Sequence, residues 1–175
     1  MSNTVIVWLV AAIFVFWALG AYNRLVRLRS QGLVTFAVLA NIFSQYIALV
    51  RNCTRDADGA EPASDWTMVD AAVVAFSTSL SLAQAQPLNK LRMNALKASY
   101  ESLLSCWAQL GESLPDAQAS GPAAVAQAHW VHISVQAAMA QIEFKRAVEN
   151  YNHAIAQFPA LLLAWIFGFK PAQPL

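Results

Sequence analysis

The sequence has little charge. Only 12% of its residues are charged, whereas 58% are hydrophobic, which is too apolar a balance for an ordinary soluble domain. Part of the apolar surplus is therefore expected to face lipid. The formal net charge is +1, so the sequence shows neither the basic excess of a nucleic-acid-binding protein nor an acidic tail.

Residues that carry chemistry are also scarce. Cys53 and Cys106 are isolated, which argues against a CxxC motif or a disulfide framework and predicts thiols suited to a reducing compartment. The six glycines are scattered, so there is no glycine-rich phosphate loop. His129 and His132 could share one helix face as metal ligands, but the ExxH pattern of di-iron bundles is absent and we favour a structural role. We predict no catalytic residue, no cofactor and no metal.

One long uncharged run lies near the amino terminus. Residues 5–22 read VIVWLVAAIFVFWALGAY, which is near the minimum length for crossing a hydrocarbon core of about 30 Å. A cleaved signal peptide is the competing interpretation, because residues 18–20 are small. The absence of Lys and Arg before the run, and their presence directly after it, favours a retained anchor. The predicted anchor residues are Trp8, Phe14, Trp17, Tyr22, Arg24, Arg27 and Arg29.

The same asymmetry predicts an orientation. By the positive-inside rule, the amino terminus lies outside and the rest of the chain lies in the cytoplasm, with a periplasmic body as the alternative. We therefore divide the chain into a transmembrane anchor at residues 1–22, a helical bundle at 23–158 and an apolar tail at 159–175.

Beyond residue 22, apolar residues recur every three or four positions, which is the helical period. The pattern predicts helices at about 23–53, 65–86, 88–110 and 123–158, the first continuing the membrane helix without a break. Pro87 separates the second and third; if it only kinked one long helix, the count would fall to three. The fold class is therefore all-α: an N-terminal transmembrane helix that continues into an antiparallel up-and-down four-helix bundle.

Each predicted helix has an apolar stripe that should face the core. The stripes are Leu25, Leu28, Gly32, Phe36, Leu39, Phe43, Tyr46 and Val50; Trp66, Val69, Val73, Phe76 and Leu80; Leu96, Tyr100, Leu103, Trp107 and Leu110; and Ala137, Ala140, Phe144, Val148, Tyr151, Ile155 and Phe158. Gly111 and Pro159 are the expected terminators of the last two helices.

An even number of helices returns the chain to the membrane surface. The tail is too short to span, but it suits the interface, where Trp and Phe favour the boundary and Lys can reach headgroups. Capping of the bundle core is the alternative, and both can hold on opposite faces. The predicted interface residues are Leu161, Leu162, Leu163, Trp165, Ile166, Phe167, Phe169 and Lys170.

Two separated motifs resemble the ends of the LemA family. They comprise Tyr22, Asn23, Leu25 and Val26 after the anchor, and Tyr151, Asn152, Ile155, Phe158, Pro159, Gly168 and Phe169 near the end. The resemblance implies a bacterial protein with one amino-terminal membrane helix and a long antiparallel bundle. It implies no established enzymatic activity, and some family members are associated with magnetosome membranes.

The chain also departs from the family pattern. Phe144 and Lys145 stand where the family usually repeats Tyr-Asn, and VLANIFSQY at residues 38–46 replaces a charged, Arg-containing stretch. We interpret this apolar replacement as a surface that packs against another protomer or against lipid. Tyr151 and Asn152 are read as a polar contact between helices that sets their register, with a small polar site as the alternative.

These observations predict a membrane-anchored, non-enzymatic scaffold at the bacterial inner membrane. It would self-assemble as a homo-oligomer through coiled-coil-like apolar faces, or organise an unlike protein partner, and it would bind the lipid bilayer but no nucleic acid. The alternative is an accessory or sensor subunit that holds a lipid, a small apolar ligand or an envelope partner protein.

Overall fold

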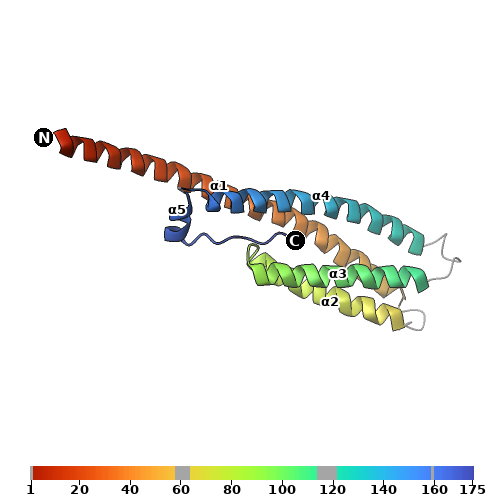
Figure 1. Cartoon of the computed structure of the whole chain (residues 1–175). Coiled ribbons are helices and arrows are strands. Elements are labelled where there is room, and N and C mark those ends of the chain that lie inside the picture. Colours follow the sequence, from red (N-terminus) through yellow and green to blue (C-terminus); the bar gives the residue numbers. More distant parts are fainter. Residues whose placement is uncertain (1, 58–63, 114–121, 159) are drawn as a thin grey trace.

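The computed structural model describes residues 2–57, 64–113, 122–158 and 160–175. These form five helices: α1 Ser2–Ala57, α2 Ser64–Ala85, α3 Lys90–Ser113, α4 Pro122–Ala156 and α5 Ala160–Phe167. No strand occurs among the described residues. The all-α class and the helical bundle behind a long apolar helix are therefore confirmed (Figure 1).

The 56 residues of α1 form one uninterrupted helix with two different environments. Its first half projects beyond the bundle (Figure 1), and the most apolar 18-residue window, with a mean hydropathy of 2.4, has no buried residue. We call residues 5–19 the bare half. The second half, from Leu25 to Val50, carries the predicted stripe on its buried side, and we call it the packed half.

α2 and α3 form a helical hairpin whose turn contains Pro87. α2 ends at Ala85, and the Asn89 side-chain oxygen caps α3 by accepting hydrogen bonds from the backbone N–H groups of Leu91 and Arg92 at 3.0 and 3.3 Å. This cap satisfies amides that a helix leaves unpaired at its start. The separation at Pro87 is thus as predicted. The expectation at Gly111 was wrong, because α3 continues through it to Ser113.

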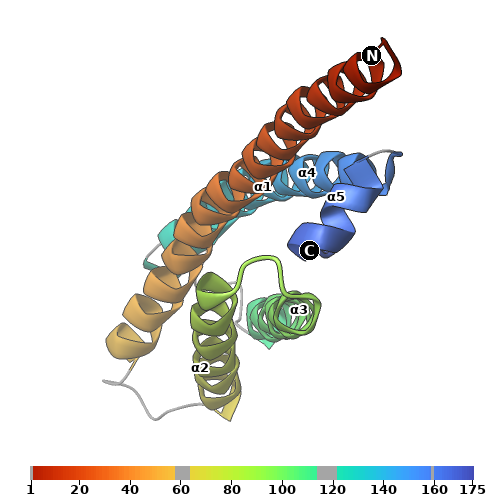
Figure 2. The same cartoon turned by 90° about the vertical axis from the view of Figure 1, so that its left-hand side faces the viewer.

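The helices pack in an antiparallel order. α1 lies against α4 and α2, and α2 lies against α3 (Figures 1 and 2). Within the described residues, α3 and α4 are joined by large side chains rather than by close backbones. The Trp107 and Trp130 rings stack at 4.3 Å between centroids, and Trp107 Nε1 donates to Gln127 Oε1 at 3.1 Å. Bulky rings therefore fill the space between these helices.

α2 also is long and apolar enough to cross a membrane, but 39% of its most apolar window is buried. Val69, Val73, Phe76 and Leu80, from its predicted stripe, lie in the same core as the packed half of α1. The apolar residues along this stripe of α2 therefore pack into the bundle core.

The apolar residues of VLANIFSQY face the chain's own core. Leu39, Ala40, Phe43 and Tyr46 are all at most 2% exposed, and only Val38 presents a large apolar side chain to the outside. The interpretation of this stretch as a contact with another protomer or with lipid was therefore wrong for these four residues. These apolar residues, which stand where the family usually has a charged stretch, add to the core of the bundle.

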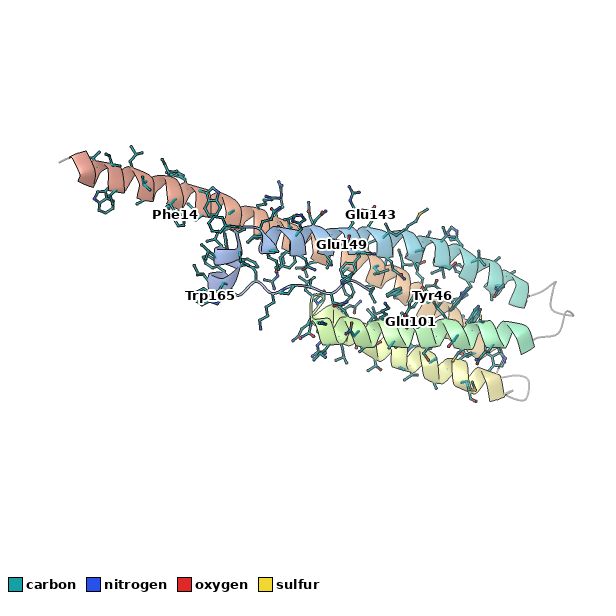
Figure 3. All side chains as sticks on the ribbon, in the orientation of Figure 1. Phe14, Tyr46, Glu101, Glu143, Glu149 and Trp165 are labelled. Atoms are coloured by element: carbon teal, nitrogen blue, oxygen red, sulfur yellow. The ribbon has the colours of Figure 1, made fainter. Side chains whose placement is uncertain are left out.

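Tyr46 is the largest fully buried side chain of that core (Figure 3). Its ring lies 4.5 Å from Trp130 and 5.9 Å from Tyr100, between centroids. Its hydroxyl makes no well-formed hydrogen bond among the described residues, although the Tyr100 side chain is close enough to act on it. Burial first, and the neighbouring Tyr100 second, raise the pKa of the Tyr46 hydroxyl.

Candidate functional site

The end of the bundle beside the bare half of α1 holds the residues that the sequence singled out. α4 ends at Ala156, and α5 runs crosswise next to α4 and α1 (Figure 1). α5 ends in a Schellman turn: Gly168 adopts a positive φ of 68°, and the Phe169 N–H donates to the Ala164 carbonyl at 2.9 Å. Glycine suits this position because a β-carbon disfavours the left-handed conformation.

α5 has one packed face and one exposed apolar face. Leu163 and Ala164 are buried, whereas Trp165 is 84% exposed and points away from the bundle (Figure 3). The exposed large apolar residues in this region, which we call the α5 apolar face, are Phe158, Leu161, Leu162, Trp165, Ile166 and Phe167. The prediction that Leu163 lies at the membrane interface was wrong, because its side chain is buried and not available to a bilayer. The prediction that Phe158 belongs to the apolar stripe of the core was also wrong, because its side chain is 80% exposed.

The Tyr22 side chain connects the end of the predicted anchor to the predicted tail through ring contacts. Its ring lies 4.9 Å from Phe167 and 6.1 Å from Phe169, between centroids. Tyr22 is the last residue of the predicted anchor, and both phenylalanines belong to the predicted tail. Aromatic contacts thus fix α5 to α1 at the boundary between its bare and packed halves.

Asn152 binds the last residues of the chain through both amide atoms. Asn152 Nδ2 donates to the Ala172 carbonyl, and the Ala172 N–H donates to Asn152 Oδ1, each at 2.8 Å. The Tyr151 hydroxyl donates to the Lys170 carbonyl at 3.1 Å. These bonds satisfy backbone groups of an extended segment that runs back from α5 along the bundle (Figure 1), where Ala172 is buried.

The partner of the Tyr-Asn pair therefore differs from the one predicted. Both side chains bond the chain's own carboxyl-terminal segment, residues 169–175, rather than a neighbouring helix. Sequence reasoning missed this segment. Pro171 and Pro174 were a usable signal, because proline favours extended backbone over helix.

Arg29 is the charge that acts on Tyr151. Burial raises the pKa of the Tyr151 hydroxyl, and the positive charge of Arg29 works against that increase. This proximity agrees with the antiparallel topology, which brings the end of α4 back to the start of the packed half of α1.

A partly open cavity of about 360 Å³ lies at the same boundary. Trp17, Gly20 and Arg24 line it from α1, and Gln157 and Phe158 line it from the segment after α4. Apart from Arg24 and Gln157, the lining is apolar. The expectation that four helices bring Phe158 back beside Arg24 is met by this shared cavity.

The described histidines do not form a metal centre. His132 Nε2 lies 3.1 Å from the Gln136 side-chain nitrogen on the same helix, and no group of three or more His, Cys, Asp or Glu side chains suited to a metal occurs in the described part of the chain.

The LemA family model matches residues 68–175, which is more than half of the chain. The chain belongs to the LemA family. No curated protein and no solved structure matches it. The match includes the closing motif but begins in α2, so the likeness of Tyr22, Asn23, Leu25 and Val26 to the family stays an interpretation.

The structure shows what several residues of the closing LemA motif contact. Tyr151 and Asn152 hold the carboxyl-terminal segment, Gly168 turns the chain into it, and Phe169 contacts Tyr22. Ile155 is buried beside them. Of the first motif, Leu25 is buried, whereas Asn23 and Val26 are exposed. Pro159 lies outside the described residues. Tyr151, Asn152 and Phe169 thus close the end of the bundle.

Proposed function

We propose that this LemA protein is a membrane-anchored, non-catalytic scaffold. Residues 5–22, which comprise the bare half and the turn that follows it, cross the bilayer, and the bundle stands on the membrane surface. The observation that carries the proposal is the meeting of two unpartnered apolar surfaces, the bare half of α1 and the α5 apolar face, at one end of the bundle (Figures 1 and 3).

The two surfaces suit two different layers of a membrane, the hydrocarbon core and the interface. The bare half is apolar on every side, which suits the hydrocarbon core. The α5 apolar face is one-sided and rich in aromatic rings, which suits the interfacial layer. Arg24, Arg27 and Arg29 follow the bare half directly and support an amino terminus outside and a bundle in the cytoplasm of a bacterial cell.

Self-assembly is supported by a third apolar surface, on α4. Val131, Val135, Met139 and Ile142 recur at helical spacing and are each 51 to 65% exposed. We call them the α4 stripe. Such a stripe on a helix matches the faces through which helices associate. In the proposed scaffold it joins copies of the chain, or binds an unlike protein partner.

Light scattering during size-exclusion chromatography of the full chain in mild detergent tests the scaffold. The expected species is a uniform large oligomer. Val135→Glu combined with Met139→Glu should reduce it to smaller species, because carboxylates buried at an interface without partners are strongly destabilising. Val34→Glu with Val38→Glu, on exposed positions of α1, is the matched control and should leave the oligomer intact. A monodisperse wild-type monomer would overturn the scaffold.

The second candidate is an accessory subunit that holds a lipid or a small apolar ligand. The cavity between Trp17 and Phe158 favours it. The two candidates predict different assemblies, because an accessory subunit should elute as a small species or with one unlike partner.

A further inference from the structure

The cavity beside Arg24 has the chemistry of a phospholipid site. The residues that α1 contributes recur at positions 17, 20, 21, 24 and 25, which places them on one helix face. From the other side the partly open cavity is lined by Ala154, Gln157, Phe158 and Ala160. Its volume of about 360 Å³ falls within the range of about 300 to 1,000 Å³ that is typical of ligand pockets.

The polarity of the cavity lining changes along α1. Arg24 is the charged group at one end, and Trp17 lies two turns nearer the amino terminus, about 10 Å away at 1.5 Å per residue. In the proposed membrane orientation Arg24 sits at headgroup level and Trp17 reaches the acyl chains, because the interfacial layer is about 5 to 8 Å thick on each side. A molecule with a charged head and an apolar tail fits this gradient.

The charge at the polar end is positive and unopposed. Within the described ranges Arg24 makes no ion pair, and the ion pair found there joins Lys145 and Glu149. A guanidinium presents paired N–H donors that match the oxygens of a phosphate. Gln157 offers an amide N–H at the same cavity.

The cavity is open beside Gly20. A β-carbon built at Gly20 meets nothing within 4 Å, although glycine costs a helix interior up to about 1 kcal/mol relative to alanine. The missing side chain leaves room for a chain of methylene groups between Trp17 and Phe158.

We propose that this cavity holds part of one diacyl phospholipid, with its phosphate on Arg24 and the upper part of one acyl chain across Gly20, while the rest of the lipid lies in the surrounding bilayer. The site rests on the proposed membrane anchoring, since the bilayer supplies the lipid. It adds to the scaffold a specific lipid contact at the joint between α1, α4 and α5.

Native mass spectrometry of the full chain in detergent tests the site with phosphatidylglycerol as the probe. The wild type should retain one lipid. Arg24→Gln should weaken retention about tenfold, the loss expected for a hydrogen bond to a charged group. Arg27→Gln, which removes an equal charge outside the cavity, should leave retention unchanged. Equal effects of the two substitutions would overturn the role of Arg24.

Gly20→Phe tests the apolar end, because the new ring would fill the cavity. It should abolish retention, whereas Leu19→Phe, on an exposed position of the same turn, should not. Helix content by circular dichroism separates blocking from misfolding. Retention by a folded Gly20→Phe protein would refute the site.

Two further probes separate the sources of phosphate. Diacylglycerol, which lacks phosphate, should bind at least tenfold more weakly than phosphatidylglycerol, and inorganic phosphate at the same concentration should not displace the lipid. Equal binding of diacylglycerol, or displacement by inorganic phosphate, would each contradict the proposal. Flotation of all variants with vesicles checks anchoring separately: a wild type that stays behind would sink the anchor, whatever its lipid retention.

Discussion

The two halves of α1 belong to one helix, yet their surroundings are opposite. In the bare half, every described large apolar side chain from Val5 to Phe16 is more than half exposed. In the packed half, Leu25, Phe36, Leu39 and Phe43 are almost completely buried. Hydrophobicity alone therefore does not tell which part of a helix finds a partner within its own chain.

The angular distribution of apolar residues explains the difference. The bare half is apolar on all sides, so one neighbouring helix could cover only part of it. The packed half has polar residues such as Asn41, Ser44 and Gln45 on its exposed side, so one stripe suffices for packing. α2 and α4 cover that stripe. The end of α4 meets α1 at the boundary between the bare half and the packed half.

The largest expected effect comes from charging the bare half. Val10→Lys combined with Phe14→Lys should prevent stable membrane integration, because each central Lys costs about 2.5 to 3.5 kcal/mol in a bilayer. Resistance to alkaline extraction from membranes measures it. Val34→Lys with Val38→Lys has the same spacing on exposed positions of the packed half and should extract like the wild type. Unchanged resistance of the first variant would refute the anchor.

A core truncation tests the packed half. Phe36 is 2% exposed and its ring lies 5.4 Å from that of Phe144. Phe36→Ala should lower the free energy of unfolding by about 3 to 5 kcal/mol, because it removes buried area and leaves a cavity. Denaturant titration in detergent measures the change. Val34→Ala is the control and should cost less than about 0.5 kcal/mol.

The contact that closes the end of the packed half should have a smaller effect. Asn152→Ala leaves the Ala172 N–H and carbonyl without their partner, which should cost about 1 to 3 kcal/mol. Hydrogen exchange at the Ala172 amide should accelerate. Asn150→Ala, an exposed position on the same helix, should change neither quantity. Unchanged stability with a lost cellular phenotype would instead favour a polar site at Tyr151 and Asn152.

The smallest effect is expected at Tyr46, where the substitution should stabilise. Tyr46→Phe removes a buried hydroxyl that makes no well-formed hydrogen bond, so the free energy of unfolding should rise by about 1 kcal/mol at pH 7. Thermal or denaturant unfolding measures it. A clear loss of stability would mean that the hydroxyl makes a favourable contact.

The same substitution has a pH signature. Burial raises the pKa of the Tyr46 hydroxyl above its ordinary value of 10.0, so above pH 10 the unfolded chain loses this proton more readily than the folded one. Titration of Tyr46 therefore leaves the free energy of unfolding unchanged below about pH 10 and lowers it as the pH rises further. Tyr46→Phe should make the alkaline loss of stability shallower than in the wild type.

Much of the fold was predictable from local patterns. The stripe from Leu25 to Val50, the break at Pro87 and the return of Phe158 to Arg24 depend on helical period, on the missing proline donor and on the parity of the helix count. The continuation of α3 past Gly111 was not predictable in this way, because an exposed glycine ends a helix only where the chain also turns. The direction of residues 38–46 was misread because an apolar stretch does not reveal which neighbour covers it.

The sequence by itself determined the four long helices, the break at Pro87, and that residues 5–22 are apolar on every side, whereas the short helix α5 was not predicted. Those properties arise from residues within a few positions of one another. Only the tertiary structure decided that Asn152 pairs with Ala172, that Tyr22 meets Phe167 and Phe169, and that α5 divides into a buried and an exposed face. These contacts depend on where the returning chain end comes to lie, and no local periodicity encodes that position.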